Sequence, residues 1–83
     1  MNKLSDLERQ VITERIRSLV QKHLEMGVSN GTKVICHNCG HAKSVVGVVF
    51  YGRYRLCNDC ALQYELAKAK GNIQTIEDFV LAD

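Results

Sequence analysis

Proline, long apolar runs, internal repeats and low-complexity segments are all absent from this chain of 83 residues. The longest apolar run extends from Val45 to Tyr51 and is interrupted by Gly47. Because a helix needs roughly 20 apolar residues to cross a bilayer, we expect a soluble protein without a membrane partner. No Ser/His/Asp set, paired-carboxylate arrangement or phosphate-cradling glycine loop is visible either, which argues against an enzyme and against a small-molecule substrate.

The charge is small and unevenly distributed. The formal net charge is +2, from 11 Lys or Arg and 9 Asp or Glu. Residues 32–71 hold six bases against Asp59 and Glu65, whereas residues 72–83 hold three acids and no base. The middle of the chain is therefore mildly basic and its tail acidic, without the strong basic footprint typical of nucleic-acid-binding proteins.

All four cysteines fall into two Cys-x-x-Cys pairs, separated by seventeen residues: Cys36, Cys39, Cys57 and Cys60. Zn²⁺ asks only for four soft donors in a tetrahedron, and two such turns can present four thiolates to one point. A chain of this size buries only about 60% of the surface that its unfolded form exposes, so its core alone is marginal. The pattern therefore predicts one structural Zn²⁺ on four thiolates.

Two alternatives compete with zinc. Disulfides would suit a secreted domain, but residues 1–8 carry charge and lack the apolar core of a signal peptide. We therefore expect a reducing, intracellular compartment, the cytoplasm or, in a eukaryote, the nucleus. A redox dithiol or an iron centre remains a distant second. A redox dithiol needs only one Cys-x-x-Cys, whereas this chain has a matched second pair.

We expect one folded unit with three segments. Residues 1–31 should form an amphipathic helix from Asp6 to Met26 and a turn, with Ser5 and Glu8 as a capping box and Gly27 as the stop. Asn30-Gly31 should then turn with positive φ angles. About 32 Å of helix outreaches one zinc finger, so its apolar stripe must cover the finger or meet a second copy in a homodimer.

Residues 32–71 should form the finger and residues 72–83 a short final helix or tail. Val34 and Ile35 favour a short strand, and a valine-rich strand from Lys43 to Phe50 should turn at Tyr51-Gly52 and pair with residues 53–56. A second helix should begin at Asn58 as its cap and end at Gly71. Knuckle, hairpin and helix are the order of a treble clef, so the predicted fold class is a small α+β zinc-stabilised domain. The final helix carries Ile76, Phe79 and Val80, with Thr75 and Asp78 as its cap.

The residues around the cysteines resemble the GATA-type zinc finger. Cys36-His37-Asn38-Cys39-Gly40 and Leu56-Cys57-Asn58-Asp59-Cys60-Ala61-Leu62-Gln63-Tyr64 are similar to that family's Cys-x-Asn-Cys-Gly and Leu-Cys-Asn-x-Cys-Gly-Leu-x-Tyr. The resemblance covers the middle third of the chain and implies that Asn38 and Asn58 brace the ligand turns. We expect Gly40 to let the backbone curl so that amides point at sulfur.

The chain departs from that family in its DNA-reading parts. Ser44-Val45-Val46-Gly47-Val48 stands where the family has Thr-Pro-Leu-Trp-Arg, and an acidic tail replaces a basic one. The zinc-binding domain of the ClpX unfoldase, the DksA and TraR group and the anti-sigma zinc protein Gin look similar in spacing. These likenesses imply binding rather than chemistry.

The sequence leaves two binding functions open. The first is a regulatory module, in transcription or a larger machine, that binds a protein partner through the first helix or the hairpin; its candidate residues are Leu7, Val11, Phe50, Tyr51 and Tyr54, with Val48. The second is a DNA-binding finger that uses its second helix and basic hairpin; its candidate residues are Lys43, Arg53, Arg55, Lys68 and Lys70. The ordinary alternative for the basic set is a solvated surface with scattered bases. For the hairpin residues it is packing in the core, since one face of a hairpin must lie inside.

An enzyme is the third and poorest hypothesis, because a catalytic zinc keeps an open position and four thiolates close the shell. His37 and His41 flank Cys39 and would replace a cysteine or tune the site, unless they are simply exposed loop residues. His23 is expected at the polar edge of the first helix's apolar stripe.

Overall fold

Helix α1 spans Asp6–Glu25 and begins where the sequence predicts. The Ser5 hydroxyl accepts a hydrogen bond from the Glu8 amide, and the Glu8 carboxylate accepts one from the Ser5 amide, both at 3.1 Å. This confirms the capping box, and Gly27 ends the helix with a φ of +85°. The computed structural model describes residues 4–80, so the ends of the predicted segments 1–31 and 72–83 lie outside the described residues.

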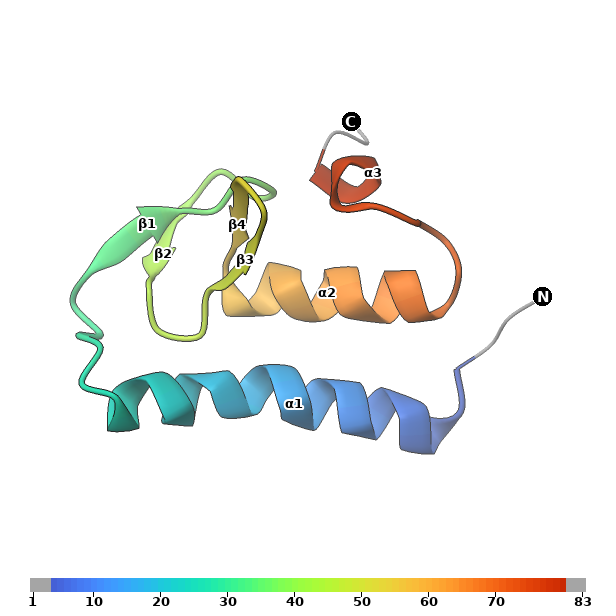
Figure 1. Ribbon diagram of the computed structural model, residues 1–83, viewed down its shortest axis with the longest axis horizontal. Helices are drawn as coiled ribbons and strands as arrows, with labels where there is room; N and C mark the ends of the chain where they lie inside the picture. Colours follow the sequence, from blue (N-terminus) through green and yellow to red (C-terminus); the bar gives the residue numbers. More distant parts are fainter. Residues whose placement is uncertain (1–3, 81–83) are drawn as a thin grey trace.

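Four short strands form two antiparallel hairpins instead of the single hairpin that we expected (Figure 1). Strand β1 (Lys33–Ile35) pairs with β2 (Ala42–Ser44), and β3 (Val49–Tyr51) pairs with β4 (Tyr54–Leu56). The predicted continuous strand 43–50 is wrong because residues 45–48 turn, with Gly47 at a φ of +85°. The Gly47 amide and carbonyl both bond to side chains, so neither is available to a sheet.

The turn after α1 also differs from the prediction. Neither Asn30 nor Gly31 has a positive φ. A serine side chain closes this turn instead, since the Ser29 hydroxyl accepts a hydrogen bond from the Gly31 amide at 3.2 Å. The Ser44 hydroxyl then donates to the Asn30 side-chain oxygen at 2.7 Å, which ties the turn to β2. Side-chain hydrogen bonds of this kind replace the left-handed geometry of an Asn-Gly turn.

Helix α2 (Asn58–Ala69) runs antiparallel to α1 and packs against it, and the short helix α3 (Ile76–Val80) lies on the other side of α2 (Figure 1). The cap of α2 is Cys57 and not Asn58, which corrects the prediction. The Thr75 and Asp78 cap of α3 is confirmed, because each side chain accepts a hydrogen bond from a backbone amide of the other residue.

The core lies between the helices and the second hairpin. Its buried members are Ile16, Leu56, Ala61, Tyr64 and three of the cysteines. Three aromatic rings continue it outward: Tyr51 contacts Tyr64 at 4.7 Å between centroids, and Tyr64 contacts Phe79 at 5.5 Å, both edge to face. The final helix therefore packs on the core, as predicted. No helix within residues 4–80 is both long enough and apolar enough to span a bilayer.

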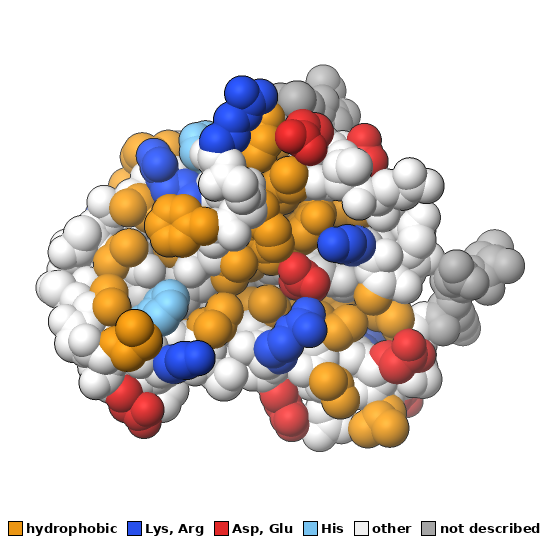
Figure 2. Space-filling view, viewed as in Figure 1, with side chains coloured by type: hydrophobic (Ala, Val, Ile, Leu, Met, Phe, Trp, Pro, Cys, Tyr) orange, Lys and Arg blue, Asp and Glu red, His pale blue; other side chains and the backbone are white. Residues whose placement is uncertain are grey.

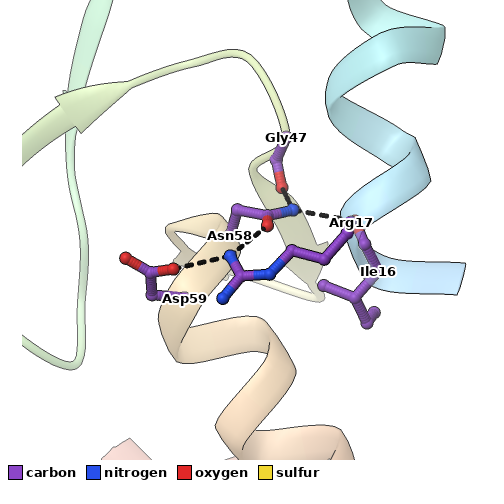
Figure 3. A network of polar contacts seen from close by, with 5 residues as sticks. All are labelled: Ile16, Arg17, Gly47, Asn58 and Asp59. Atoms are coloured by element: carbon purple, nitrogen blue, oxygen red, sulfur yellow. Dashed lines mark hydrogen bonds and ion pairs between the residues drawn. The ribbon is translucent and has the colours of Figure 1, made fainter. Parts of the chain in front are cut away.

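A polar network holds α1 against the finger (Figure 3). The Asn58 amide nitrogen donates to the Ile16 carbonyl at 2.8 Å and to the Gly47 carbonyl at 3.0 Å. Arg17 donates to the Asn58 side-chain oxygen at 2.8 Å and to the Asp59 carboxylate at 2.6 Å. One asparagine thus joins α1, the turn before β3 and the start of α2.

Replacing Gly47 by alanine tests how closely this turn docks on α1. An added Cβ would lie 2.7 Å from Val20 Cγ2, in a left-handed backbone that disfavours any side chain. Gly52 has a similar φ of +62° but no atom within 4 Å of the added Cβ, which makes Gly52→Ala the matched control. We expect Gly47→Ala to lower the free energy of unfolding by about 1–3 kcal/mol more than Gly52→Ala, because overpacking costs that much. Equal losses in urea denaturation would contradict the close docking.

Candidate metal centre

The four cysteines converge on one point from two hairpins and a helix. Cys36 directly follows β1, Cys39 lies in the turn to β2, Cys57 directly follows β4, and Cys60 lies in the first turn of α2. Their four Sγ atoms all lie within 4.8 Å of one another. A tetrahedral ion with bonds of about 2.3 Å to sulfur needs sulfur atoms about 3.8 Å apart. The cluster therefore has the donor set and the size of a four-thiolate metal site.

The surroundings of the cluster are dry and supply amide donors to sulfur. Cys36, Cys57 and Cys60 are buried, and Cys39 is half-buried. The Asn38 backbone amide donates to Cys36 Sγ and its side-chain amide donates to Cys60 Sγ, both at 3.4 Å. Asn38 therefore touches one sulfur of each pair. Such donors stabilise negative charge on sulfur and orient the thiolates toward a shared ion.

Gly40 and Asn58, the other two residues expected to brace the cysteines, act through hydrogen bonds to groups other than sulfur. Gly40 has a φ of +75°, and its amide donates to the Cys36 carbonyl at 2.9 Å, which closes the first Cys-x-x-Cys turn. Asn58 makes none of its side-chain hydrogen bonds to sulfur; it supports the second pair by fixing the start of α2 against α1. Sequence reasoning missed this role because it depends on contacts with residues about 42 positions earlier.

The thiols of the cluster do not ionise alike. Burial opposes a charge on Cys36, yet hydrogen bonds from the backbone amides of Cys39, Cys57 and Asn38 lower the pKa of its thiol to about 6. Burial raises the pKa of Cys57, and it raises the pKa of Cys60 to about 12 against the opposing Asn38 amide. The negative charge of Cys36 adds to both increases. Cys36 is therefore a thiolate at neutral pH, while Cys57 and Cys60 keep their protons until a metal ion displaces them.

The histidines near the cluster have other tasks. His37 Nδ1 accepts a hydrogen bond from the Arg55 amide at 2.8 Å, and its ring meets the Tyr54 ring edge to face. His23 Nδ1 accepts from the Gly47 amide at 2.8 Å, so it anchors the turn before β3 to α1. His41 is exposed. Within residues 4–80, the four cysteines are the only group of three or more potential metal ligands close enough to share an ion.

The basic residues predicted to contact nucleic acid are spread over β2, the second hairpin and the end of α2. Arg53 and Arg55 lie on the second hairpin, and the Arg55 side chain donates to the Ile35 carbonyl at 3.0 Å. Lys43 lies in β2, paired with Val34. Lys68 and Lys70 lie at the far end of α2, where Lys68 sits over the Tyr64 ring at 5.8 Å.

The apolar residues predicted to meet a partner divide into exposed and packed sets. Leu7 (69% exposed), Val11 (55%) and Phe50 (65%) project into solvent. Tyr51 instead packs on Tyr64, and its hydroxyl donates to Glu65 at 2.7 Å; with burial as the main cause, this raises the pKa of Tyr51. Tyr54 is half-buried, and Val48 is buried. Tyr51 and Val48 are therefore packing residues, in line with the ordinary alternative.

Comparison of the chain with protein-family models, with curated proteins and with solved structures finds no match. The class of the protein therefore follows from its own geometry: a small α+β domain of one long helix, two hairpins and further helices around a four-cysteine cluster suited to a metal ion. The resemblance to GATA-type fingers stays a resemblance of sequence.

Asn38→Ala tests whether the amide contact to sulfur contributes to metal binding. The substitution removes the side-chain donor to Cys60 and leaves all four sulfurs. We expect Zn²⁺ affinity, measured by competition with a chelator of known affinity, to fall about 10- to 100-fold, as it does when partners of metal ligands are removed. Asn72→Ala, at an exposed asparagine beyond α2, is the control and should bind like the unchanged chain. Equal affinities for both variants would contradict the role of Asn38.

Acidification should release the ion. Cys57 and Cys60 have raised pKa values in the metal-free chain, so at neutral pH each holds a proton that must leave when the metal binds. Affinity is therefore greatest at high pH and falls as the pH falls. With at least two protons displaced, we expect Zn²⁺ affinity to drop at least about 100-fold between pH 8 and pH 7. A change under tenfold in the same competition assay would contradict this account.

Proposed function

We propose that the protein is a non-catalytic zinc module in which Cys36, Cys39, Cys57 and Cys60 hold one structural Zn²⁺. The observation that supports this most directly is that four sulfurs lie within 4.8 Å of one another, with no other ligand from residues 4–80 in the group. Four thiolates complete the tetrahedral shell, whereas catalytic zinc sites use three protein ligands and a water. The ion would then serve to fix the two hairpins and α2 relative to one another.

The proposed function of the module is regulatory binding of another protein, in transcription or in a larger assembly. The supporting feature is the outward face of α1 near its N-terminus. Leu7, Glu8, Val11 and Ile12 line an open, apolar hollow of about 320 Å³ there. Large exposed apolar patches mark contact sites on proteins, and Leu7 and Val11 bring two exposed apolar side chains to this hollow. We name this surface, defined by these four residues, the α1 patch.

A heterologous protein fits the α1 patch better than a second copy of the chain. A stable interface buries about 800 Å² and involves about 20–30 residues on each partner. Within residues 4–80 only these four line the hollow, far fewer than such an interface needs, so these four residues meeting their copies face to face would not sustain a dimer. They suit one apolar side chain of a larger partner, which inserts as an anchor in a transient contact.

Double-stranded DNA reading by α2 has less support. Of the twelve residues in α2, only Asp59, Gln63, Lys68 and Ala69 are exposed, and α1 packs along the helix. Asp59 would oppose phosphate, and its partner Arg17 is already engaged. An α-helix reads bases by presenting a row of free side chains to the major groove, and α2 presents few.

Site-specific photo-crosslinking tests the proposed partner. A photoreactive residue at Val11, in the α1 patch, should give one adduct of defined mass in cells that express the chain. The same group at Gln21, farther along the exposed face of α1, is the matched control and should not give that adduct. Leu7→Asp should abolish the Val11 adduct, and the purified partner should bind the Leu7→Asp chain at least about tenfold more weakly.

Two results would overturn the proposed partner. An adduct of twice the chain mass of 9.3 kDa would identify a second copy as the occupant. Identical adducts from positions 11 and 21 would mean that the α1 patch has no special affinity.

A further inference from the structure

Exposed aromatic and basic side chains lie together on the second hairpin. Phe50 is 65% exposed, although it is one of only two phenylalanines in the chain. It pairs with Arg55 across β3 and β4, so the two side chains are neighbours on one face of the hairpin. The other face carries Val49 and the fully buried Leu56, so Phe50 and Arg55 lie on the outward face. An aromatic ring and a guanidinium therefore share a solvent-facing surface.

Arg55 extends this surface to the first hairpin. Its side chain donates to the Ile35 carbonyl at 3.0 Å, and its backbone amide donates to His37 at 2.8 Å. Ile35 is itself 49% exposed, and Lys33 shares its face of β1 by strand alternation. The ends of β1 and β4 thus form one continuous platform instead of two separate loops.

Arg53 lies in the turn at the tip of the hairpin and extends the platform there, whereas Tyr54 lies on the Leu56 face by strand alternation. The Arg53 guanidinium lies 5.3 Å from the centre of the Tyr54 ring and donates to its hydroxyl at 3.2 Å. The His37 ring meets the Tyr54 ring edge to face, at 5.7 Å between centroids. We call the whole surface the hairpin patch; its members are Lys33, Ile35, His37, Phe50, Arg53 and Arg55.

The charge around the hairpin patch favours an anion. Residues 26–58 contain four Lys or Arg and no Asp or Glu. A Zn²⁺ on four thiolates would add a formal −2 beneath the hairpins, which leaves a positive balance. Figure 2 shows basic, histidine and hydrophobic side chains side by side over the hairpins, with acidic ones over the helices. The main partner of Arg53 is the Tyr54 hydroxyl; the charge of Glu77 on α3 acts on Arg53 more weakly, and no salt bridge joins them.

We propose that the hairpin patch binds single-stranded nucleic acid. Unpaired bases offer flat faces that stack on exposed aromatic rings, and the phosphates between them pair with neighbouring cations. A duplex keeps its bases stacked inside, so Phe50 would find no partner there. An acidic peptide would satisfy the arginines and leave the ring in water. This surface is separate from the α1 patch, so the inference goes beyond the proposed function and does not rest on it.

Fluorescence anisotropy with labelled oligonucleotides of about 15 nucleotides, dT and rU, tests the proposal on the full metal-loaded chain. We expect binding to one or both strands and weaker binding to a duplex of the same length. Three cations, Lys33, Arg53 and Arg55, predict a slope of about −2 for log affinity against log salt, at −0.7 per phosphate contact. A preference for rU over dT would identify RNA as the ligand, and a preference for dT would identify DNA.

Matched variants separate stacking from charge. Phe50→Ala should weaken binding about tenfold, the scale of one lost base stack, whereas Leu7→Ala, at an equally exposed apolar residue, should not. Phe50→Trp keeps an aromatic ring at this position and should bind about as tightly as the unchanged chain. Arg53→Gln should weaken binding and reduce the size of the salt slope by about 0.7, whereas Lys22→Gln, at an exposed residue of α1, should leave both unchanged. Metal content and circular dichroism verify that each variant is folded.

Three results would overturn the proposal. If Phe50→Ala binds as tightly as the unchanged chain, Phe50 does not stack on a base. Equal affinity for the duplex would mean that the surface responds to phosphate density alone. Competition by polyglutamate as effective as competition by the oligonucleotide would make the hairpin patch a site for acidic peptides. None of these results touches the α1 patch, so failure here is distinguishable from failure of the protein-partner proposal.

Discussion

The rest of the structure depends on the convergence of four sulfur atoms that the chain separates by up to 24 positions. Each hairpin has strands of only three residues, too short to be stable alone in water. The cysteines join the end of β1 to the end of β4 and to the first turn of α2, and three of them are part of the buried core. A metal ion that contributes on the order of 10 kcal/mol would match the whole net stability of a small domain. Hairpins of this size would then be held rigid by the ion.

A second constraint sets where α1 lies. Asn58, Arg17 and His23 connect the helix to the turn at Gly47 and to α2 through hydrogen bonds, three of which join a side chain to a backbone group. Ile16 is buried beside this network. The C-terminal half of α1 is thereby fixed against the finger, whereas Leu7 and Val11 in its first two turns are exposed. The α1 patch and the hairpin patch are therefore different surfaces.

Much of this fold can be predicted from local sequence. The capping box at Ser5, the spacing of the cysteines, the stop at Gly71 and the cap of α3 each depend on residues a few positions apart, and the structure agrees with them. The errors arise where distant contacts override local preference. The valines around Gly47 favour a strand, but Asn58 and His23 capture the glycine's backbone. Asn58 is a good cap by composition, yet its side chain turns to α1 and leaves Cys57 in that position. Neither could be found without knowing that α1 packs on α2. The same holds for the candidate surfaces, because exposure of Leu7 and Phe50 and burial of Tyr51 follow from packing and not from residue type.

The most direct test of the central claim is the backbone amide NMR spectrum of the purified chain before and after removal of its metal by a chelator. If one ion on four thiolates holds the hairpins and α2 together, amide signals from residues 33–69 should be dispersed with the metal and collapse to the narrow range of an unfolded chain without it. They should recover when one equivalent of Zn²⁺ is added. Retention of the same dispersed signals in the metal-free chain would show that the cysteine cluster is not what the fold depends on.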